Sequence, residues 1–248
     1  MPEPNPEDPP QLSTMDKTAT RTGLAVQIRS CLDGLGATAR TIRLTKHPGG
    51  LTVRKTLLDR LDNIWWEHRM GISTRGIVPT DHPDSVHYGT MAYRAIHGIL
   101  DHLDLRSSDV FVDIGSGKGR VLCCAARRTV RRVVGVELSA ELCRQARENA
   151  DHLQGRRAPI TVENVLADKY DYADTTVLFL FDPFGAATLQ SALERIAEGT
   201  RGRDLRIAYA NPTHDEVFQE QPWLDGGERL SRDRTGWEHD VTFYRGRR

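Results

Sequence analysis

The sequence predicts an α/β fold with a doubly wound, mostly parallel sheet and an N-terminal helical extension. Short apolar runs suited to buried parallel strands recur from residue 110 onward, at residues 110–112, 133–136, 160–162, 177–181 and 205–209. Each segment between successive runs is long enough to return the chain through a crossover helix, as residues 119–128, 140–153 and 186–198 illustrate. Strands that alternate with helices in this way predict one main α/β core.

Apolar spacing predicts the individual helices and the C-terminal edge of the sheet. Helical periodicity predicts helices near residues 24–35, 57–65 and 92–103, ahead of the first strand. Within residues 140–153, Ser139 is placed to cap the helix, and its apolar stripe is expected to contain Leu138, Leu142, Ala146, Ala150 and Leu153. After Pro212, short runs near residues 229–231 and 241–244 predict an antiparallel strand pair at the C-terminal edge.

Composition divides the chain into three expected segments. Residues 1–20 contain five prolines among acids and hydroxyls, which is typical of a disordered tail. We expect residues 21–87 to form a helical or lid segment and residues 88–248 to form the main domain. No internal repeat and no second core are recognisable.

Charge and cysteine content restrict the expected partners and location. The 34 basic residues equal the 34 acidic ones, so no overall field favours nucleic acid or an anionic membrane. The four cysteines form no C-x-x-C pair and are expected to be buried in a reducing compartment. No apolar run reaches the ~18 residues of a membrane span, and prolines and acids begin the chain. We therefore expect a soluble cytoplasmic protein without a metal site, because its histidines lack metal-ligand spacing.

The most informative stretch is residues 113–119, Asp-Ile-Gly-Ser-Gly-Lys-Gly, which follows the first strand and precedes a helix. In an open α/β sheet, ligands bind beyond the carboxyl ends of the strands, so this loop faces the expected ligand. Gly115 and Gly117 let the backbone turn sharply and approach a ligand closely. The loop does not match two familiar phosphate-binding patterns. The dinucleotide pattern requires glycine where Arg120 stands, and the P-loop requires Ser or Thr where Gly119 follows Lys118.

Acidic residues follow three successive strands. Asp113 ends the first strand, Glu137 ends the second, and Asp168 follows the third. A carboxylate beside the loop repels phosphate but attracts an ammonium or sulfonium group. Glu137 is placed to accept ribose hydroxyls, and Asp168 is placed to accept from the exocyclic amine of adenine. These three acids predict an adenosine ligand that carries positive charge.

Residues 113–119 resemble the D/E-x-G-x-G-x-G first motif of the class I S-adenosylmethionine (SAM)-dependent methyltransferases, and Glu137 matches their second acid. The resemblance spans about residues 88–212. It implies a Rossmann-like sheet of the methyltransferase type, SAM as cofactor, and methyl transfer as the activity. It also implies that the loop holds the methionine part of SAM, Glu137 the ribose and Asp168 the adenine. The expected cofactor-binding residues are thus Asp113, Gly115, Ser116, Gly117, Glu137 and Asp168.

Within this superfamily, residues 112–117, 135–138 and 181–185 resemble a branch that includes the non-SET histone-lysine methyltransferases and many bacterial relatives. A long basic nucleosome-binding tail is missing, which argues against a histone substrate. The fourth strand ends in Asp182-Pro183-Phe184, which resembles the [D/N]-P-P-[Y/F] motif of amino-group methyltransferases but lacks one proline. The resemblance implies that Asp182 is catalytic and that Pro183 and Phe184 contact substrate. Alternatively, Asp182 caps the next helix.

The sequence leaves the acceptor open. Tyr88 and residues 71–76 lie where related enzymes place a lid, so Tyr88 is a further substrate-binding candidate. A protein side chain or a metabolite is favoured over nucleic acid as the acceptor. An amine nitrogen is one candidate for the methylated atom, and oxygen, carbon and sulfur stay open. The alternatives are an NAD-dependent oxidoreductase on the same sheet, a SAM-binding protein without catalysis, and transfer of another group from a SAM derivative.

Overall fold

A computed structural model describes residues 50–76 and 89–247, and the chain divides into two compact units, residues 1–64 and 65–248. In the first unit, the described part belongs to helix α2 (Gly50–Met70), which continues into the second unit. This helix confirms the one predicted near residues 57–65. The helix predicted near residues 24–35 and the proline-rich segment lie outside the described residues, so the three-segment division stays a prediction.

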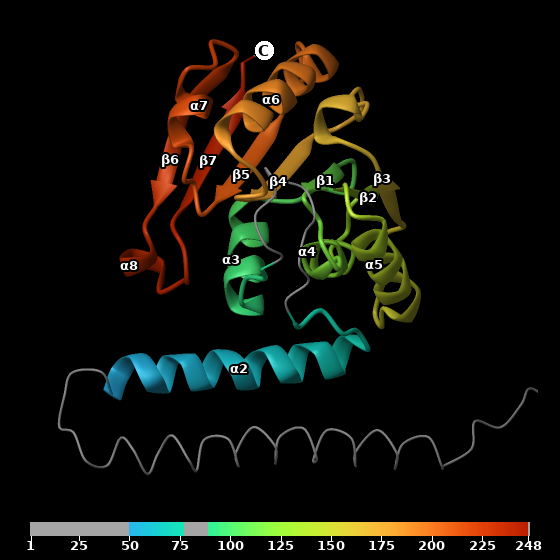
Figure 1. The fold of residues 1–248 in the computed structure, drawn as a ribbon, viewed down its shortest axis with the longest axis vertical. Helices are drawn as coiled ribbons and strands as arrows, with labels where there is room; N and C mark the ends of the chain where they lie inside the picture. Colours follow the sequence, from blue (N-terminus) through green and yellow to red (C-terminus); the bar gives the residue numbers. More distant parts are fainter. Residues whose placement is uncertain (1–49, 77–88, 248) are drawn as a thin grey trace, which may run out of the picture. The chain divides into compact units, whose positions relative to one another are not determined.

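The second unit contains, among its described residues, a seven-stranded sheet with the order β3-β2-β1-β4-β5-β7-β6 (Figure 1). The first five strands in this order are parallel, and β7 pairs antiparallel with both β5 and β6. The strands are β1 (Val110–Ile114), β2 (Arg132–Glu137), β3 (Ile160–Asn164), β4 (Val177–Phe181), β5 (Arg206–Ala210), β6 (Leu224–Leu230) and β7 (Val241–Gly246). The predicted parallel sheet with an antiparallel C-terminal edge is confirmed.

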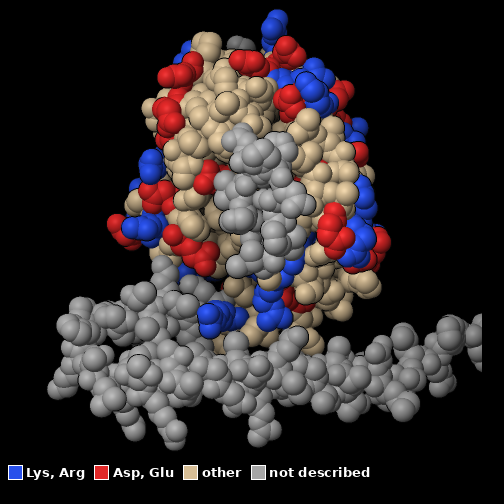
Figure 2. Space-filling view, viewed as in Figure 1, with Lys and Arg blue, Asp and Glu red and all other residues tan. Residues whose placement is uncertain are grey.

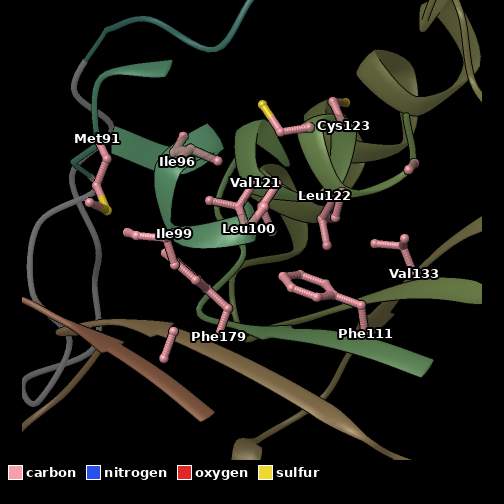
Figure 3. Packing of buried hydrophobic residues seen from close by; sticks show 14 of the residues in the cluster. Met91, Ile96, Ile99, Leu100, Phe111, Val121, Leu122, Cys123, Val133 and Phe179 are labelled. Atoms are coloured by element: carbon pink, nitrogen blue, oxygen red, sulfur yellow. The ribbon is translucent and has the colours of Figure 1, made fainter. Parts of the chain in front are cut away.

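Helices cover both faces of this sheet. Figure 1 shows α3 (Tyr93–His102), α4 (Arg120–Ala125) and α5 (Ala140–His152) on one face, and α6 (Ala186–Thr200) and α7 (Asp215–Gln219) on the other. Two clusters of buried apolar side chains match these two layers. Figure 3 shows Phe111 of β1 and Phe179 of β4 extending toward the helices on the α3 and α4 side. Buried side chains of this size contribute about 2 kcal/mol each to stability, so the central strands hold the loops at their ends in place.

The structure differs from the predicted elements at three points. Ser139 Oγ accepts a hydrogen bond from Leu142 N at 3.3 Å and begins α5, which leaves Leu138 ahead of the helix and 40% exposed rather than in its apolar stripe. Strand β6 begins at Leu224, earlier than predicted, because this bulged edge strand is largely exposed and polar and shows no apolar alternation. Helices α7 and α8 (Arg232–Thr235) were not predicted, because four or five residues are too few to show periodicity.

The described cysteines are buried thiols. Cys123, Cys124 and Cys143 are free and buried, and burial raises the pKa of Cys123 to about 12 and of Cys143 to about 11. In the described part of the chain, no group of three or more His, Cys, Asp or Glu side chains is arranged to hold a metal ion. Of the helices in residues 50–76 and 89–247, none has the length and apolarity that a membrane span requires.

Candidate functional site

The glycine loop follows the central strand β1 and wraps around the end of β2. Gly115 N and Ser116 N both donate to Val136 O, at 2.9 and 3.3 Å. Gly115, Gly117 and Gly119 have φ values of 73°, 54° and 80°, a left-handed backbone that favours glycine. A Cβ on Gly115 would also lie 2.6 Å from Pro183 Cβ. The loop is therefore packed against the residue that follows Asp182, at the end of the neighbouring strand β4.

A pocket lies beside this loop, and Asp113 forms part of its wall. The lining comes from the segment before α3, from α3, from the glycine loop and α4, and from β1 and β4: Gly89, Thr90, Met91, Ile96, Asp113, Gly115, Ser116, Arg120, Val121, Phe179 and Phe181. Asp113 is 3% exposed, and desolvation, with a smaller contribution from the Glu137 carboxylate, raises the pKa of Asp113 well above its usual range. A cation that entered the pocket would stabilise the charged form of this carboxyl group.

Glu137, at the end of β2, accepts hydrogen bonds from backbone amides of the glycine loop and of the segment before α5. Glu137 Oε2 accepts from Gly117 N at 2.9 Å, and Oε1 accepts from Ser139 N at 2.9 Å. Asn164 of β3 donates to the carbonyl oxygens of Glu137 and Leu138, at 3.1 and 2.7 Å. Each carboxylate oxygen has a second lone pair, so Glu137 retains acceptor capacity for a ligand hydroxyl. These contacts hold its carboxylate against the glycine loop and beside the exposed Leu138 side chain.

Arg120 brings a buried positive charge to the same pocket. Its guanidinium donates to Thr74 Oγ1 at 2.7 Å and to Met91 O at 2.8 Å, and it pairs with Glu67 Oε1 at 3.2 Å. The guanidinium carbon also lies 4.6 Å from the ring centre of Tyr93. Glu67 pairs with Arg75 as well, at 2.6 Å, so one carboxylate is shared by two guanidinium groups. The pocket walls therefore contain one buried acidic side chain, Asp113, and one buried basic side chain, Arg120.

Residues 71–76, which lie where related enzymes place a lid, are attached to the glycine loop and α5. Asn149 of α5 accepts from Ser73 N at 2.9 Å and donates to Ser73 O and Lys118 O, at 3.1 and 2.9 Å. Lys118 Nζ donates to Arg75 O at 2.7 Å. Together with the hydrogen bond from Arg120 to Thr74, these bonds hold residues 71–76 against the glycine loop and α5.

Asp182 occupies the end of β4 in a strained backbone conformation. Its φ is 38°, in the left-handed region that non-glycine residues seldom adopt. Asp182 Oδ2 accepts from Asn211 Nδ2 at 3.0 Å, and Oδ1 accepts from Thr213 Oγ1. Helix α6 has Gly185 as its N-cap residue and no side-chain cap, so helix capping does not explain Asp182. Asn211, at the end of β5, shares the left-handed conformation with a φ of 50°.

The remaining predicted site residues are Asp168, Ser116, Pro183, Phe184 and Tyr88. Asp168 lies in a single 3-10 turn, η1 (Ala167–Lys169), and its carboxylate pairs with Lys169 Nζ at 3.0 Å. Ser116 lines the pocket, but its hydroxyl is turned toward β2, 2.6 Å from where a Cβ on Gly135 would lie. Pro183 contacts the glycine loop, and Phe184 packs against the α6 side of the sheet. Tyr88 lies outside the described residues.

Sequence reasoning missed Arg120 and two exposed leucines as site candidates. Arg120 entered the argument only as a mismatch to the dinucleotide pattern, and its position directly after the glycine loop was the available signal. Leu138 and Leu166 are each 40% exposed, unlike the other apolar residues around them. They follow strands β2 and β3 directly or within two residues. Their position after strands, rather than helical spacing, was the available signal.

The strand order, with β7 antiparallel between β5 and β6, and the glycine loop after β1 define a class I SAM-dependent methyltransferase fold. A family model described as "Histone methylation protein DOT1" matches residues 82–164, about a third of the chain, and these residues include β1, β2, β3 and the glycine loop. The match is consistent with the branch that the sequence indicated. No curated protein matches the chain.

Among solved structures, the chain is similar to an RNA methyltransferase from Salinibacter ruber in complex with S-adenosyl-L-homocysteine (SAH). That likeness has 21% identity, covers 68% of this chain and 93% of the other, and has a TM-score of 0.48. A SAM-dependent O-methyltransferase from Thermotoga maritima shows 19% identity over 65% of this chain and 68% of its own, with a TM-score of 0.48. An rRNA methylase from Streptococcus thermophilus shows 15% identity over 64% and 100%, with a TM-score of 0.49.

The chain is thus a SAM-dependent methyltransferase, and the predictions of its fold, enzyme class and cofactor are confirmed. The family match and the strand order support this conclusion, whereas the solved structures are too distant to carry it. The NAD-dependent alternative loses its support, because a buried arginine occupies the position of the third glycine. The acceptor and the roles of individual site residues are matters for proposal.

Proposed function

We propose that this methyltransferase methylates an amine nitrogen of a protein side chain or a metabolite, held at Asp182. The observation that carries the proposal is the placement of Asp182. Its carboxylate is fixed by Asn211 and Thr213, and the next residue, Pro183, packs on Gly115 of the glycine loop. Asp182 therefore stands where the strand end meets the cofactor loop. Its remaining lone pairs are available to accept from an amine.

The pocket walls support a specific placement of the cofactor. SAM, when bound, supplies a sulfonium-activated methyl group that transfers by in-line displacement at carbon. Asp113 would bind the ammonium of its methionine part, and Arg120 would bind the carboxylate, because the pocket offers one buried group of each sign. Glu137 would accept from the ribose hydroxyls. The backbone amides of Gly115 and Ser116 are engaged with Val136 O, so the glycines contribute space for close approach.

The exposed leucines complete this placement. Leu138 and Leu166 would pack on the two faces of adenine, which supplies apolar area without charge. Asp168 would accept from the exocyclic amine after giving up part of its contact with Lys169. Positioning and the exclusion of water would then provide most of the rate, since the methyl group is already activated.

Surface charge supports a protein side chain or a metabolite over nucleic acid as acceptor. Among the described residues visible in Figure 2, acidic and basic side chains are interspersed, without a continuous basic surface that would follow a phosphate backbone. A cytoplasmic location belongs to the same proposal, and the three free, buried cysteines support it.

Label transfer tests the acceptor class. The purified protein is incubated with methyl-labelled SAM and a cell extract, and the labelled fraction is isolated. The same extract is then offered after its primary amines have been acetylated. An amine acceptor loses its label after acetylation, whereas hydroxyl and carboxyl acceptors keep it. Label that persists at full strength in the acetylated extract contradicts the proposal.

The role of Arg120 is tested without any acceptor. Arg120→Lys keeps the charge but loses the fork of donors, so we expect the affinity for SAH to fall about tenfold, as for one charge-assisted hydrogen bond. Affinity for methylthioadenosine, which has no carboxylate, should be unchanged. Calorimetry measures both, and Arg195→Lys on α6 is the matched control. Equal losses for the two ligands would contradict the assignment to the carboxylate.

A further inference from the structure

The β6–β7 loop, residues 231–240, places a histidine beside Phe181, which lines the pocket. The ring of His239 lies 5.1 Å from the ring of Phe181, centre to centre, and Phe181 lines the pocket beside the glycine loop. Asp240 O accepts from Asn211 N at 2.9 Å, and Asn211 in turn donates to Asp182. His239 is therefore adjacent to the strand ends that carry both the pocket and Asp182.

The loop is anchored on both sides of His239. Glu238 Oε2 accepts from Ala92 N at 2.8 Å, at the start of α3, and Arg94 donates to Gly236 O at 2.8 Å. Trp237 lies so close to α3 that a Cβ on Gly98 would be 2.6 Å from its ring. Figure 1 shows α8, which belongs to this loop, on the α3 side of the sheet. These contacts hold the backbone of residues 236–240 in place.

The His239 ring itself makes no hydrogen bond to any of the described residues. Its neighbours are engaged elsewhere, since Glu238 binds Ala92 N and Asp240 pairs with Arg229 at 2.8 Å. An imidazole nitrogen that accepts no hydrogen bond from the described residues keeps a lone pair toward them, and that lone pair can take up a proton. Asp182 differs, because its carboxylate already accepts from Asn211 and Thr213.

We propose that His239 accepts the proton that the acceptor nitrogen loses on methylation, while Asp182 orients that nitrogen. The proposal rests on the proposed function. The nitrogen lone pair forms the N–CH3 bond, and the C–S bond breaks with its electron pair left on sulfur. The proton lost by the nitrogen goes to an imidazole nitrogen of His239 and from there to solvent. His239 is thus a further catalytic residue, supplied by a loop that no motif marks.

The first test needs no acceptor. Histidine side-chain NMR signals are followed in the full chain while SAH, and separately sinefungin, is added. Sinefungin carries a primary amine in place of the S-methyl group. We expect the His239 signals, assigned with His239→Gln, to shift more with sinefungin than with SAH, while those of the exposed His152 stay unchanged in both. Identical His239 shifts with the two ligands overturn the proposal. If neither ligand binds the wild-type protein, the proposed function itself fails.

The second test uses turnover with the labelled acceptor fraction. His239→Gln should lower kcat by about 10²-fold, within the range of general-base catalysis, and leave the affinity for SAH unchanged. His152→Gln should change neither. In His239→Ala, added imidazole should restore part of the turnover, which a merely structural role would not produce. Thermal unfolding confirms that each variant is folded. Full activity of folded His239→Gln, or no rescue of His239→Ala, overturns the proposal.

Discussion

The two halves of the sheet are built differently at their carboxyl ends. In the half formed by β1, β2 and β3, the glycine loop and the acid that binds it lie close in the sequence, because Glu137 and Gly117 are 20 residues apart. Arg120 reaches further, to Glu67, 53 residues away. In the half formed by β4, β5, β6 and β7, the contacts around Asp182 come from separate strand ends. Glu238 contacts Ala92 across 146 residues, and Asp182 contacts Asn211 and Thr213 across 29 and 31.

Under the proposed function, this difference separates cofactor binding from acceptor recognition. A motif records the glycine loop and Glu137 of the proposed cofactor end, whereas Arg120 is held there by Glu67 and Thr74, which no motif marks. The acceptor end depends on loops from several strands that meet only in the folded protein, and such loops vary with substrate on a common fold. Changes at the first end should thus alter affinity for SAH, and changes at the second should alter turnover alone.

Of the predicted changes, Gly115→Ala should have the largest effect, which is a loss of affinity for the cofactor product SAH. The new Cβ would meet Pro183 at 2.6 Å and would force alanine into a left-handed backbone. Because the loop must move, we expect affinity for SAH to fall by about 10²-fold or more, as measured by calorimetry. Gly202→Ala has the same backbone strain but open space around it, so it should cost about 1 kcal/mol of stability and leave binding intact. Equal SAH affinity in both variants would contradict the role of Pro183.

Asp182→Asn should lower turnover without changing the affinity for SAH. The substitution keeps the size of the side chain and removes the charge that orients the acceptor, so turnover should fall by about 10²-fold. Affinity for SAH should remain that of the wild-type protein, because Asp182 does not line the pocket. Asp233→Asn, on the exposed surface of α8, is the control. A parallel loss of SAH affinity would show that the two ends are not separable.

Asp113→Asn should give a smaller effect that differs in sign between stability and binding. A carboxyl group whose pKa is raised in the folded state binds its proton more tightly there than in the unfolded chain, so stability falls as pH rises from the ordinary carboxyl range toward the raised value. Asparagine removes that cost, and we expect a gain of about 1 kcal/mol at neutral pH in urea unfolding. Affinity for SAH should fall about tenfold, because the ammonium loses its charged partner. A destabilised variant would show that the ionised carboxyl group is not costly to bury.

The central sheet was predictable almost residue by residue, and the cofactor loop with it. Strand β4 was predicted at its observed bounds, Val177–Phe181, because a fully buried strand must be apolar throughout. Leu138 was misplaced because an apolar residue next to a helix looks like part of its stripe, and only Ser139 as N-cap shows that it lies outside. Arg120 was visible in the sequence, but its partners Glu67 and Thr74 precede the sheet and share no motif with it.

The sequence by itself determined the fold, the enzyme class and the residue types of the cofactor loop. Local rules were sufficient there, because apolar periodicity encodes strands and helices, and left-handed turns select glycine. Only the tertiary structure decided that Arg120 shares a pocket with Asp113, that Asp182 is bound by Asn211 and Thr213, and that His239 lies against Phe181. Those contacts arise where strands and loops far apart in the chain meet at one edge of the sheet, and no sequence spacing encodes them.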